Sequence, residues 1–285
     1  MTQTQFTAPT TVRSAVRCLA EGGKNPKVLA GGTDLLVQLR AGRVKPTTIV
    51  DLKKIPELKV IKTEKGGFRI GAAVAGAELN AHKAVKKAWP GLVEGLDLIG
   101  STQIQGRASL GGNLCNGSPA ADSVPALIAA AATCKIAGPK GVRHAKVESI
   151  VTGPGKTSLK KGEFIVSFFL PKRAKRSGDA YLRLIPRTEM DIAVVGAGVS
   201  LTVDAKGVCT DARVSLGAVA PKPLLVKAGA KALIGTTVDD DAPFFRASSS
   251  SRMRFCTCEG NVACAAAAAD PVRSFIFFSA ALCVK

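Results

Sequence analysis

The chain has 285 residues, 46% of them hydrophobic, and a formal charge of +19 at pH 7. This length is enough for two domains, and this apolar fraction is typical of a globular protein rather than a disordered one. No apolar run reaches the roughly 18 residues that a membrane-spanning helix needs, and Met1–Pro9 lacks the apolar core of a secretory signal. We therefore expect a soluble, cytoplasmic protein without a membrane span.

The excess of basic residues makes nucleic acid a candidate partner. The 40 Lys and Arg residues are scattered, however, and one Trp, one Tyr and eleven Phe offer few platforms for base stacking. The eight Cys residues include no C-x-x-C pair, which argues against zinc, iron–sulfur clusters and an exported disulfide scaffold. We expect no metal site and no nucleic-acid partner, and a basic nucleic-acid-binding protein stays as an alternative.

Roughly the first 55 residues alternate predicted helices and strands, which is typical of a small α/β unit. The first helix has Thr10 or Thr11 as its cap and ends at Gly22-Gly23. The predicted elements are a helix over 12–19, a strand over 28–30, a helix over 34–40, and strands over 48–52 and 68–72.

In the rest of the chain, the polar, glycine-rich segment Ala108–Gly117 is predicted to be a loop, and the basic stretch Lys172–Arg176 to mark a domain boundary. Ser123 is the expected cap of the helix that follows the loop. The predicted elements are helices over 77–100, 123–132 and 228–234, strands over 133–137, 164–170 and 208–216, and an apolar strand or helix over 191–203.

Two double-glycine segments carry the functional signal, namely Leu29–Leu35 and Ser109–Asn113. Glycine allows positive φ and a close backbone approach, and successive N–H groups in such turns form an anion site. Two such segments could hold a pyrophosphate between them. Gly196-Ala-Gly198 lacks the third glycine of a dinucleotide fingerprint and is interpreted as core packing. No nucleophile system or acid–base pair is evident, so we predict a cofactor holder without catalytic residues.

Both segments resemble the glycine motifs of the FAD-binding medium subunit of molybdenum hydroxylases. That family includes the flavin subunit of aerobic carbon monoxide dehydrogenase and the flavin domain of xanthine dehydrogenase. The resemblance covers residues 1 to about 242, in the same order and spacing. Further matches are Ser118-Pro119, Asp122, Gly162-Glu163, Pro171, Tyr181-Leu182-Arg183, Arg187 and Asp191-Ile192-Ala193.

The resemblance implies an α+β fold. It places an N-terminal FAD-binding domain of the PCMH type at residues 1–175, with two α/β subdomains that divide near residues 55–60. A smaller α+β domain is expected at residues 176–285.

The resemblance also implies non-covalent binding of FAD and a set of contacts. Tyr181 corresponds to the residue that covers one face of the flavin, and Arg183 stands where the family usually has Lys, which differs in hydrogen-bond geometry. The implied FAD contacts are Leu29, Ala30, Gly31, Gly32, Thr33, Asp34, Leu35, Ser109, Leu110, Gly111, Gly112, Asn113, Asp122, Ile165, Tyr181 and Arg183.

The implied function is electron transfer within a larger oxidoreductase. A large subunit would carry the molybdenum cofactor, and a small subunit would carry two [2Fe–2S] clusters that pass electrons to FAD. The flavin would then reduce NAD⁺, oxygen or another acceptor, and the expected assembly is a dimer of heterotrimers. A stand-alone flavin-dependent oxidase is the alternative within flavin chemistry.

Residues 243–285 depart from the family pattern. They hold six of the eleven Phe and four of the eight Cys, a run of four Ser and a run of five Ala. Their apolar residues do not follow a helical period, so they cannot give one buried stripe. We interpret this tail as frameshifted or divergent, and expect it to be irregular and poorly packed rather than a closing helix.

Overall fold

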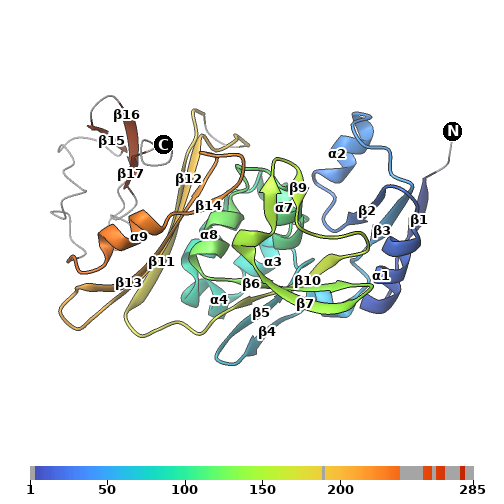
Figure 1. Cartoon of the computed structure of the whole chain (residues 1–285), viewed down its shortest axis with the longest axis horizontal. Helices are drawn as coiled ribbons and strands as arrows, with labels where there is room; N and C mark the ends of the chain where they lie inside the picture. The colour runs from blue at the N-terminus through green and yellow to red at the C-terminus, as the bar shows by residue number, and fades with distance from the viewer. Residues whose placement is uncertain (1–3, 188–189, 238–252, 259–260, 267–276, 280–285) are drawn as a thin grey trace.

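The computed structural model describes residues 4–187, 190–237, 253–258, 261–266 and 277–279. Figure 1 shows a small parallel sheet near the N-terminus, a larger antiparallel sheet in the middle, and a third, antiparallel sheet beyond a layer of helices. The expected α+β class is therefore confirmed. No helix in these ranges is long and apolar enough to cross a membrane.

The N-terminal unit is a three-stranded parallel sheet in the order β1-β3-β2. Thr11 caps its first helix, and a reciprocal capping box with Ser14 fixes the helix start. Ala15 and Leu19 bury one face of that helix. The elements are β1 (Gln5–Thr7), α1 (Val12–Glu21), β2 (Pro26–Leu29), α2 (Leu35–Arg40) and β3 (Thr48–Asp51).

The middle unit is a five-stranded antiparallel sheet, ordered β4-β5-β10-β6-β7, with a cluster of short helices on one face. Its strands are β4 (Ile61–Glu64), β5 (Gly67–Gly71), β6 (Thr133–Gly138), β7 (Gly141–Lys146) and β10 (Phe164–Leu170). Its helices are η1 (Pro56–Lys59), α3 (Gly76–Asn80), α4 (Lys83–Ala88), α5 (Pro90–Asp97), α6 (Thr102–Gln105), α7 (Leu110–Asn116), α8 (Ser123–Ala129) and η2 (Val147–Ser149). A two-stranded sheet, β8 (Val151–Gly153) and β9 (Lys156–Thr157), precedes β10.

Strand β10 joins the two units because it is buried on both faces. Phe164 and Val166 belong to the core shared with α1 and β3. Ile165 and Phe168 belong to the core shared with the helices. Side chains alternate between the faces of a strand, and the register shift between Ile165 and Ser167 in the pairing with β6 marks an irregularity in this alternation.

The third sheet is antiparallel, in the order β11-β12-β13-β14, and packs against α5 and α8 and against the single helix α9. A Cβ at Gly91 of α5 would collide with the backbone of Ala180 in β11, and a Cβ at Gly198 of β12 would collide with the backbone of Pro125 in α8. Because both residues are glycine, the two helices can lie close against the strands of the third sheet. The interpretation of Gly196–Gly198 as core packing is confirmed. The elements are β11 (Ser177–Leu184), β12 (Val195–Val203), β13 (Cys209–Gly217), β14 (Leu224–Leu225) and α9 (Lys227–Leu233).

The described parts of the tail are strands, namely β15 (Met253–Cys258), β16 (Asn261–Ala266) and β17 (Phe277–Ser279). They form a three-stranded antiparallel sheet. The expectation of an irregular backbone is therefore wrong for these three stretches. The rest of the predicted atypical tail, and the side-chain packing expected to be poor, lie outside the described residues.

Two local predictions in the middle unit are also wrong. Ala108–Gly117 is not a loop, because Leu110–Asn116 forms α7 with Ser109 as its cap. Ser123 does not cap α8, since Asp122 holds the cap position and the hydroxyl of Ser123 instead bonds Asn113. Outside the tail, the strands that were not predicted are β1, β4, β7, β8, β9, β11 and β14.

Candidate functional site

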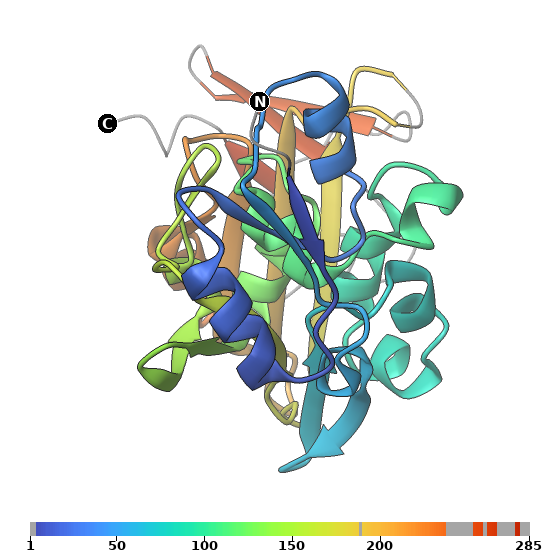
Figure 2. The same cartoon turned by 90° about the vertical axis from the view of Figure 1, so that its right-hand side faces the viewer.

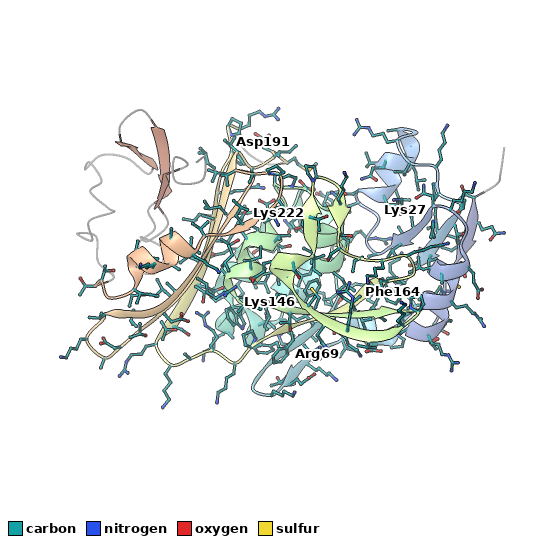
Figure 3. All side chains as sticks on the ribbon, in the orientation of Figure 1. Lys27, Arg69, Lys146, Phe164, Asp191 and Lys222 are labelled. Atoms are coloured by element: carbon teal, nitrogen blue, oxygen red, sulfur yellow. The ribbon has the colours of Figure 1, made fainter. Side chains whose placement is uncertain are left out.

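A cavity of about 390 Å³ lies where the N-terminal unit meets the middle unit. This volume is within the range of small-molecule sites, roughly 300–1,000 Å³. Figure 3 labels two residues of its wall, Lys27 on β2 and Phe164 on β10. The predicted site residues that line it are Ala30, Gly31, Gly32, Thr33, Asp34, Leu35, Ser109, Gly111, Gly112, Asn113 and Ile165.

The first glycine segment forms the wall on the side of the parallel sheet. In the described structure, the five backbone N–H groups from Gly31 to Leu35 donate to no protein acceptor. The segment is held from behind, since Lys53 Nζ donates to the Ala30 carbonyl at 3.1 Å and Leu52 N donates to the Leu29 carbonyl at 3.0 Å. A row of unpaired N–H groups that begins at this anchored point is suited to an anionic oxygen-rich ligand.

Glycine is needed at the two positions of the first segment, Gly31 and Gly32, for different structural reasons. A Cβ at Gly31 would collide with the carbonyl of Arg107, so glycine allows this segment to touch the chain just before the second one. Gly32 has φ +86°, a left-handed conformation that glycine adopts without strain. The first segment thus touches the backbone at Arg107 and Ala108, immediately before the second segment.

The second glycine segment is the first turn of α7. The Ser109 hydroxyl accepts a hydrogen bond from the Gly112 N–H at 3.2 Å, which caps the helix. A Cβ at Gly111 would lie 2.6 Å from the Ala72 carbonyl oxygen, so packing requires that glycine. A Cβ at Gly112 would meet only Ser109 Oγ, at 3.3 Å, within 4 Å. Protein packing therefore does not explain Gly112, and the approach of a ligand would.

The side chain of Asn113 ties α7 to α8. Its Oδ1 accepts hydrogen bonds from the Ser123 hydroxyl at 2.7 Å and from the Ser123 backbone N–H at 3.3 Å. Ser123 is fully buried, so this pair is protected from water. Asn113 lines the cavity but its carbonyl is already committed to holding the helix in place.

A second amide joins α7 to the wall formed by Asp34 and α2. Asn116 Nδ2 donates to Asp34 Oδ1 at 3.2 Å, and Gln38 Nε2 donates to Asn116 Oδ1 at 3.3 Å. Burial raises the pKa of the Asp34 carboxyl from its ordinary value. Sequence reasoning missed Gln38 and Asn116, together with Cys115. All three follow predicted site residues at helical spacing, and recognising α7 as a helix would have revealed Asn116 and Cys115.

Three predicted contacts lie in a separate buried cluster rather than on the cavity wall. Tyr181, 2% exposed, donates its hydroxyl proton to Asp122 Oδ1 at 2.9 Å, and Arg183 Nη1 bonds Asp122 Oδ2 at 3.0 Å. Burial raises the pKa of the Asp122 carboxyl and that of the Tyr181 hydroxyl. Leu29 and Leu110 are buried behind the glycine segments and also do not line the cavity.

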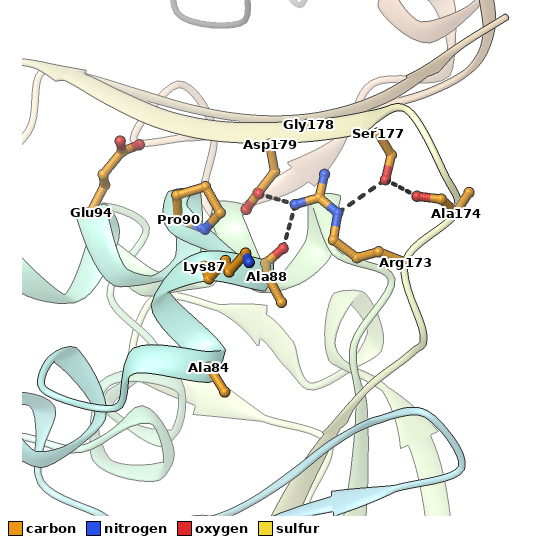
Figure 4. Close-up of a pocket in the computed structure, with 10 residues that line it drawn as sticks. All are labelled: Ala84, Lys87, Ala88, Pro90, Glu94, Arg173, Ala174, Ser177, Gly178 and Asp179. Atoms are coloured by element: carbon orange, nitrogen blue, oxygen red, sulfur yellow. Dashed lines mark hydrogen bonds and ion pairs between the residues drawn. The ribbon is translucent and has the colours of Figure 1, made fainter.

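A second cavity, of about 470 Å³, lies at the junction with the third sheet (Figure 4). Arg173 is the centre of its polar wall. The guanidinium pairs with Asp179, donates to the Ala88 carbonyl at 2.6 Å and to Ser177 Oγ at 3.1 Å, and stacks over the Trp89 ring. These contacts join the middle unit to β11, which gives the arginine a structural role.

The described residues offer little support for a metal site or for a covalent bond between the protein and a ligand. No group of three His, Cys, Asp or Glu residues there is placed to hold a metal ion. Cys115 lines the cavity, but burial raises the pKa of its thiol to about 12. A thiol with such a pKa is protonated at neutral pH and is a poor nucleophile. The geometry fits a ligand that is held by hydrogen bonds and apolar contacts.

Two protein-family models match the chain. The model of the FAD-binding domain in molybdopterin dehydrogenase matches residues 2–173. The model of the carbon monoxide dehydrogenase flavoprotein C-terminal domain matches residues 180–252. The first of these alone covers more than half of the chain, including both glycine segments and the whole cavity wall.

Individual relatives agree with these matches. The chain is 35% identical over 218 residues to the xanthine dehydrogenase FAD-binding subunit of Escherichia coli O157:H7, covering 75% of this chain and 73% of the relative. It is 31% identical over 238 residues to the carbon monoxide dehydrogenase medium chain of Hydrogenophaga pseudoflava, covering 84% and 82%. A solved structure of reconstituted carbon monoxide dehydrogenase from Oligotropha carboxidovorans superposes with a TM-score of 0.80 at 29% identity, covering 84% and 83%.

Proposed function

Because this chain belongs to the FAD-binding medium subunits of the molybdenum hydroxylases, the family of carbon monoxide and xanthine dehydrogenases, we propose that it binds one FAD non-covalently in the cavity between its two glycine segments. Bound FAD supplies the redox chemistry, while the chain supplies its position and its electrostatic surroundings. The chain is thus the flavin-carrying subunit of a multi-subunit oxidoreductase.

The row of unpaired N–H groups from Gly31 to Leu35 carries this proposal. A diphosphate offers several anionic oxygens, and neutral N–H dipoles bind them without the cost of burying a cation. Lys27 is the one cation among the described residues of the wall, where it adds a single positive charge. We assign the diphosphate to this segment, with residues 29–35 as its cradle.

The second segment has a complementary role in the proposal. Gly112 gives the ligand close access to the first turn of α7, while Ser109 and Asn113 are committed to fixing that helix. Ile165 of β10 contributes an apolar contact to the same wall. The proposed FAD contacts of this side are Ser109, Leu110, Gly111, Gly112, Asn113 and Ile165.

We also propose FAD contacts for the buried cluster of Asp122, Tyr181 and Arg183, the last two of which belong to β11 of the third sheet. Tyr181 has its ring buried and its hydroxyl bonded to Asp122. Covering a flavin face would therefore require that ring to become exposed when the cofactor binds. The Tyr181 and Arg183 contacts to FAD stay predictions.

We propose that electrons reach the flavin from [2Fe–2S] clusters on a small partner subunit and leave to a terminal acceptor. The molybdenum cofactor would be on a large partner subunit, in a dimer of heterotrimers located in the cytoplasm. The proposed domain division is 1–175 for FAD binding, with subdomains that divide near 55–60, and 176–285 for the second domain, with 243–285 atypical.

The first test is the flavin content of the purified chain. We expect about one FAD per chain, released by acid, because the wall offers hydrogen bonds rather than a reactive thiolate. Flavin that stays with the acid-precipitated protein would favour a stand-alone oxidase with a covalent flavin. Colourless protein that takes up no added FAD would refute the proposal.

The second test asks whether the N–H row binds the diphosphate. The stripped protein is titrated with FAD, FMN and riboflavin, and ADP is used as a competitor. Since only FAD and ADP carry a diphosphate, we expect FAD to bind most tightly and ADP to displace it. If riboflavin binds as tightly as FAD, residues 31–35 do not hold a diphosphate.

A further inference from the structure

Helix α2 forms part of the cavity wall without being packed into the protein. Its residues Leu35 and Gln38 line the cavity, yet no residue of the helix is buried. Leu36 is 43% exposed and Val37 61% exposed, although both are apolar. Among the described elements, α2 has no extended packing contact with another helix or strand. A helix with so little burial is held in place by few interactions.

Glycines in the left-handed region lie on both sides of this helix. Gly32 has φ +86° and Gly42 has φ +67°, and a Cβ at Gly42 would meet nothing within 4 Å. Hinges are short segments whose backbone dihedrals can change while the element between them stays intact. Gly32 and Gly42 are therefore candidate hinges for the unit of residues 33–41.

Only one side chain ties this unit to the opposite wall in the described hydrogen-bond network. Asn116 closes α7 and bonds both Asp34 and Gln38, at 3.2 and 3.3 Å. A carboxylate only accepts hydrogen bonds, so Nδ2 must face Asp34, which leaves Oδ1 free to accept from Gln38. An amide is the side-chain group that provides a donor and an acceptor in this arrangement.

We propose that residues 33–41 are a lid over the cofactor cavity and that Asn116 is the positioning residue that clasps it shut. The proposal rests on the proposed function, since it assigns the lid to FAD. Closing the lid brings the end of the N–H row, Thr33 to Leu35, into its place in the wall. The two long hydrogen bonds are weak enough to open, and together they set how long the cofactor stays bound.

The test compares Asn116→Ala with Asn80→Ala. The control also removes an amide that bonds an aspartate, Asp97, but at the end of α3 and off the wall of this cavity. FAD association and dissociation are followed by stopped-flow fluorescence. For Asn116→Ala we expect dissociation about tenfold faster, the change that loss of one or two hydrogen bonds gives, with association no slower. An unchanged dissociation rate would overturn the proposal.

A double-mutant cycle with Gln38→Ala tests the clasp from the lid side. Since Gln38 acts through Asn116, the two substitutions together should accelerate dissociation less than the product of the single effects. Independent, multiplying effects would mean that the two residues do not form one device.

Hydrogen exchange separates this proposal from the FAD assignment. In the cofactor-free protein, Asn116→Ala should increase exchange of the α2 amides Leu36, Gln38 and Ala41, with α1 unchanged. This readout needs no flavin, so it holds even if the chain binds no FAD and the proposed function fails. Unchanged exchange in α2 would show that Asn116 does not hold the lid.

Discussion

The four glycines of the two motifs act in different ways, although the sequence presents them as two equivalent pairs. Gly31 and Gly111 are required by contacts within the protein, with the carbonyls of Arg107 and Ala72. Gly32 is required by its left-handed backbone. Gly112 is the one of the four that neither a tight protein contact nor a left-handed backbone requires. It is helical, and a Cβ added there would meet only the hydroxyl of the capping residue Ser109.

Gly112→Val should therefore abolish FAD retention while leaving the fold intact. The added methyl groups would occupy space that we assign to the ligand, and overpacking of this kind costs about 1–3 kcal/mol, or about ten- to a hundredfold in affinity. FAD affinity is measured by fluorescence titration. Gly153→Val is the matched control, since a Cβ there meets nothing within 4 Å and the residue is outside the cavity wall. Equal affinities in the two variants would exclude Gly112 from the site.

Tyr181 is the second residue whose role the structure specifies, through the hydrogen bond that its hydroxyl makes. It donates to Asp122, which also accepts from Arg183 Nη1, so one buried carboxylate serves two donors inside the core. Tyr181→Phe leaves the ion pair in place and should lower the free energy of unfolding by about 1–2 kcal/mol. FAD retention should stay unchanged, because any flavin contact would use the ring. Loss of FAD at unchanged stability would instead assign the hydroxyl to the cofactor.

At the scale of secondary structure, elements that depend on local features could be predicted, and elements that depend on tertiary packing could not. Helix α1 could be predicted because its cap and its apolar face are local features. Helix α7 could not, since two glycines in a seven-residue helix each cost about 1 kcal/mol in propensity. That cost is offset by packing against Ala72 and by the Ser109 cap, which sequence alone does not show.

The missed strands have the same explanation. Strand β7 is the edge of its sheet and carries Lys, Arg and His, as exposed edges commonly do, so it lacks the usual apolar alternation. Strand β11 directs Asp179, Tyr181 and Arg183 towards helices, where ion pairs and hydrogen bonds replace apolar contacts. The candidate site was predictable in its two motifs, whereas Gln38 and Asn116 depend on α2 and α7 lying across one cavity.

The junction between α4, α5 and β11 should be sensitive to pH. Burial raises the pKa of Asp179 from 3.8 to about 6, an effect increased by Glu94 and opposed by Arg173. Between pH 4 and 6 the folded state therefore keeps a proton that the unfolded state has released. Stability from this group is present at low pH and is lost as the pH rises through that window.

Asp179→Asn should remove this dependence. Relative to the variant, the wild-type protein should lose roughly 1–3 kcal/mol of unfolding free energy between pH 4.5 and 7. Urea denaturation at the two pH values measures the difference, and Asp211→Asn, which removes an exposed carboxylate, is the control. A difference of opposite sign would mean that the Arg173 ion pair, rather than burial, dominates the pKa of Asp179.

The whole molecule is built around the middle sheet, which shares its cores with both neighbours. Phe164 and Val166 pack with α1 of the N-terminal unit, and Tyr181 of β11 belongs to the core beneath the helices. Figure 2 looks from the side of the parallel sheet and shows the strands of the third sheet standing behind it. The cofactor cavity lies at the first of these junctions, so its shape depends on how the N-terminal unit packs on β10.

The charge of +19 is a property of the whole molecule. It allows the proposed FAD binding to be tested against nucleic-acid binding through the salt dependence of each. Binding by scattered Lys and Arg releases many counterions, so DNA affinity should fall by about a thousandfold between 50 and 200 mM salt. FAD should behave differently, because N–H dipoles and one cation, Lys27, face it among the described wall residues. We expect the dissociation constant of FAD to change by less than about threefold over the same range.

The measurement is a titration of one preparation with FAD and with duplex DNA at both salt concentrations. FAD binding that falls as steeply as DNA binding would mean that surface cations, rather than the glycine segments, hold the flavin.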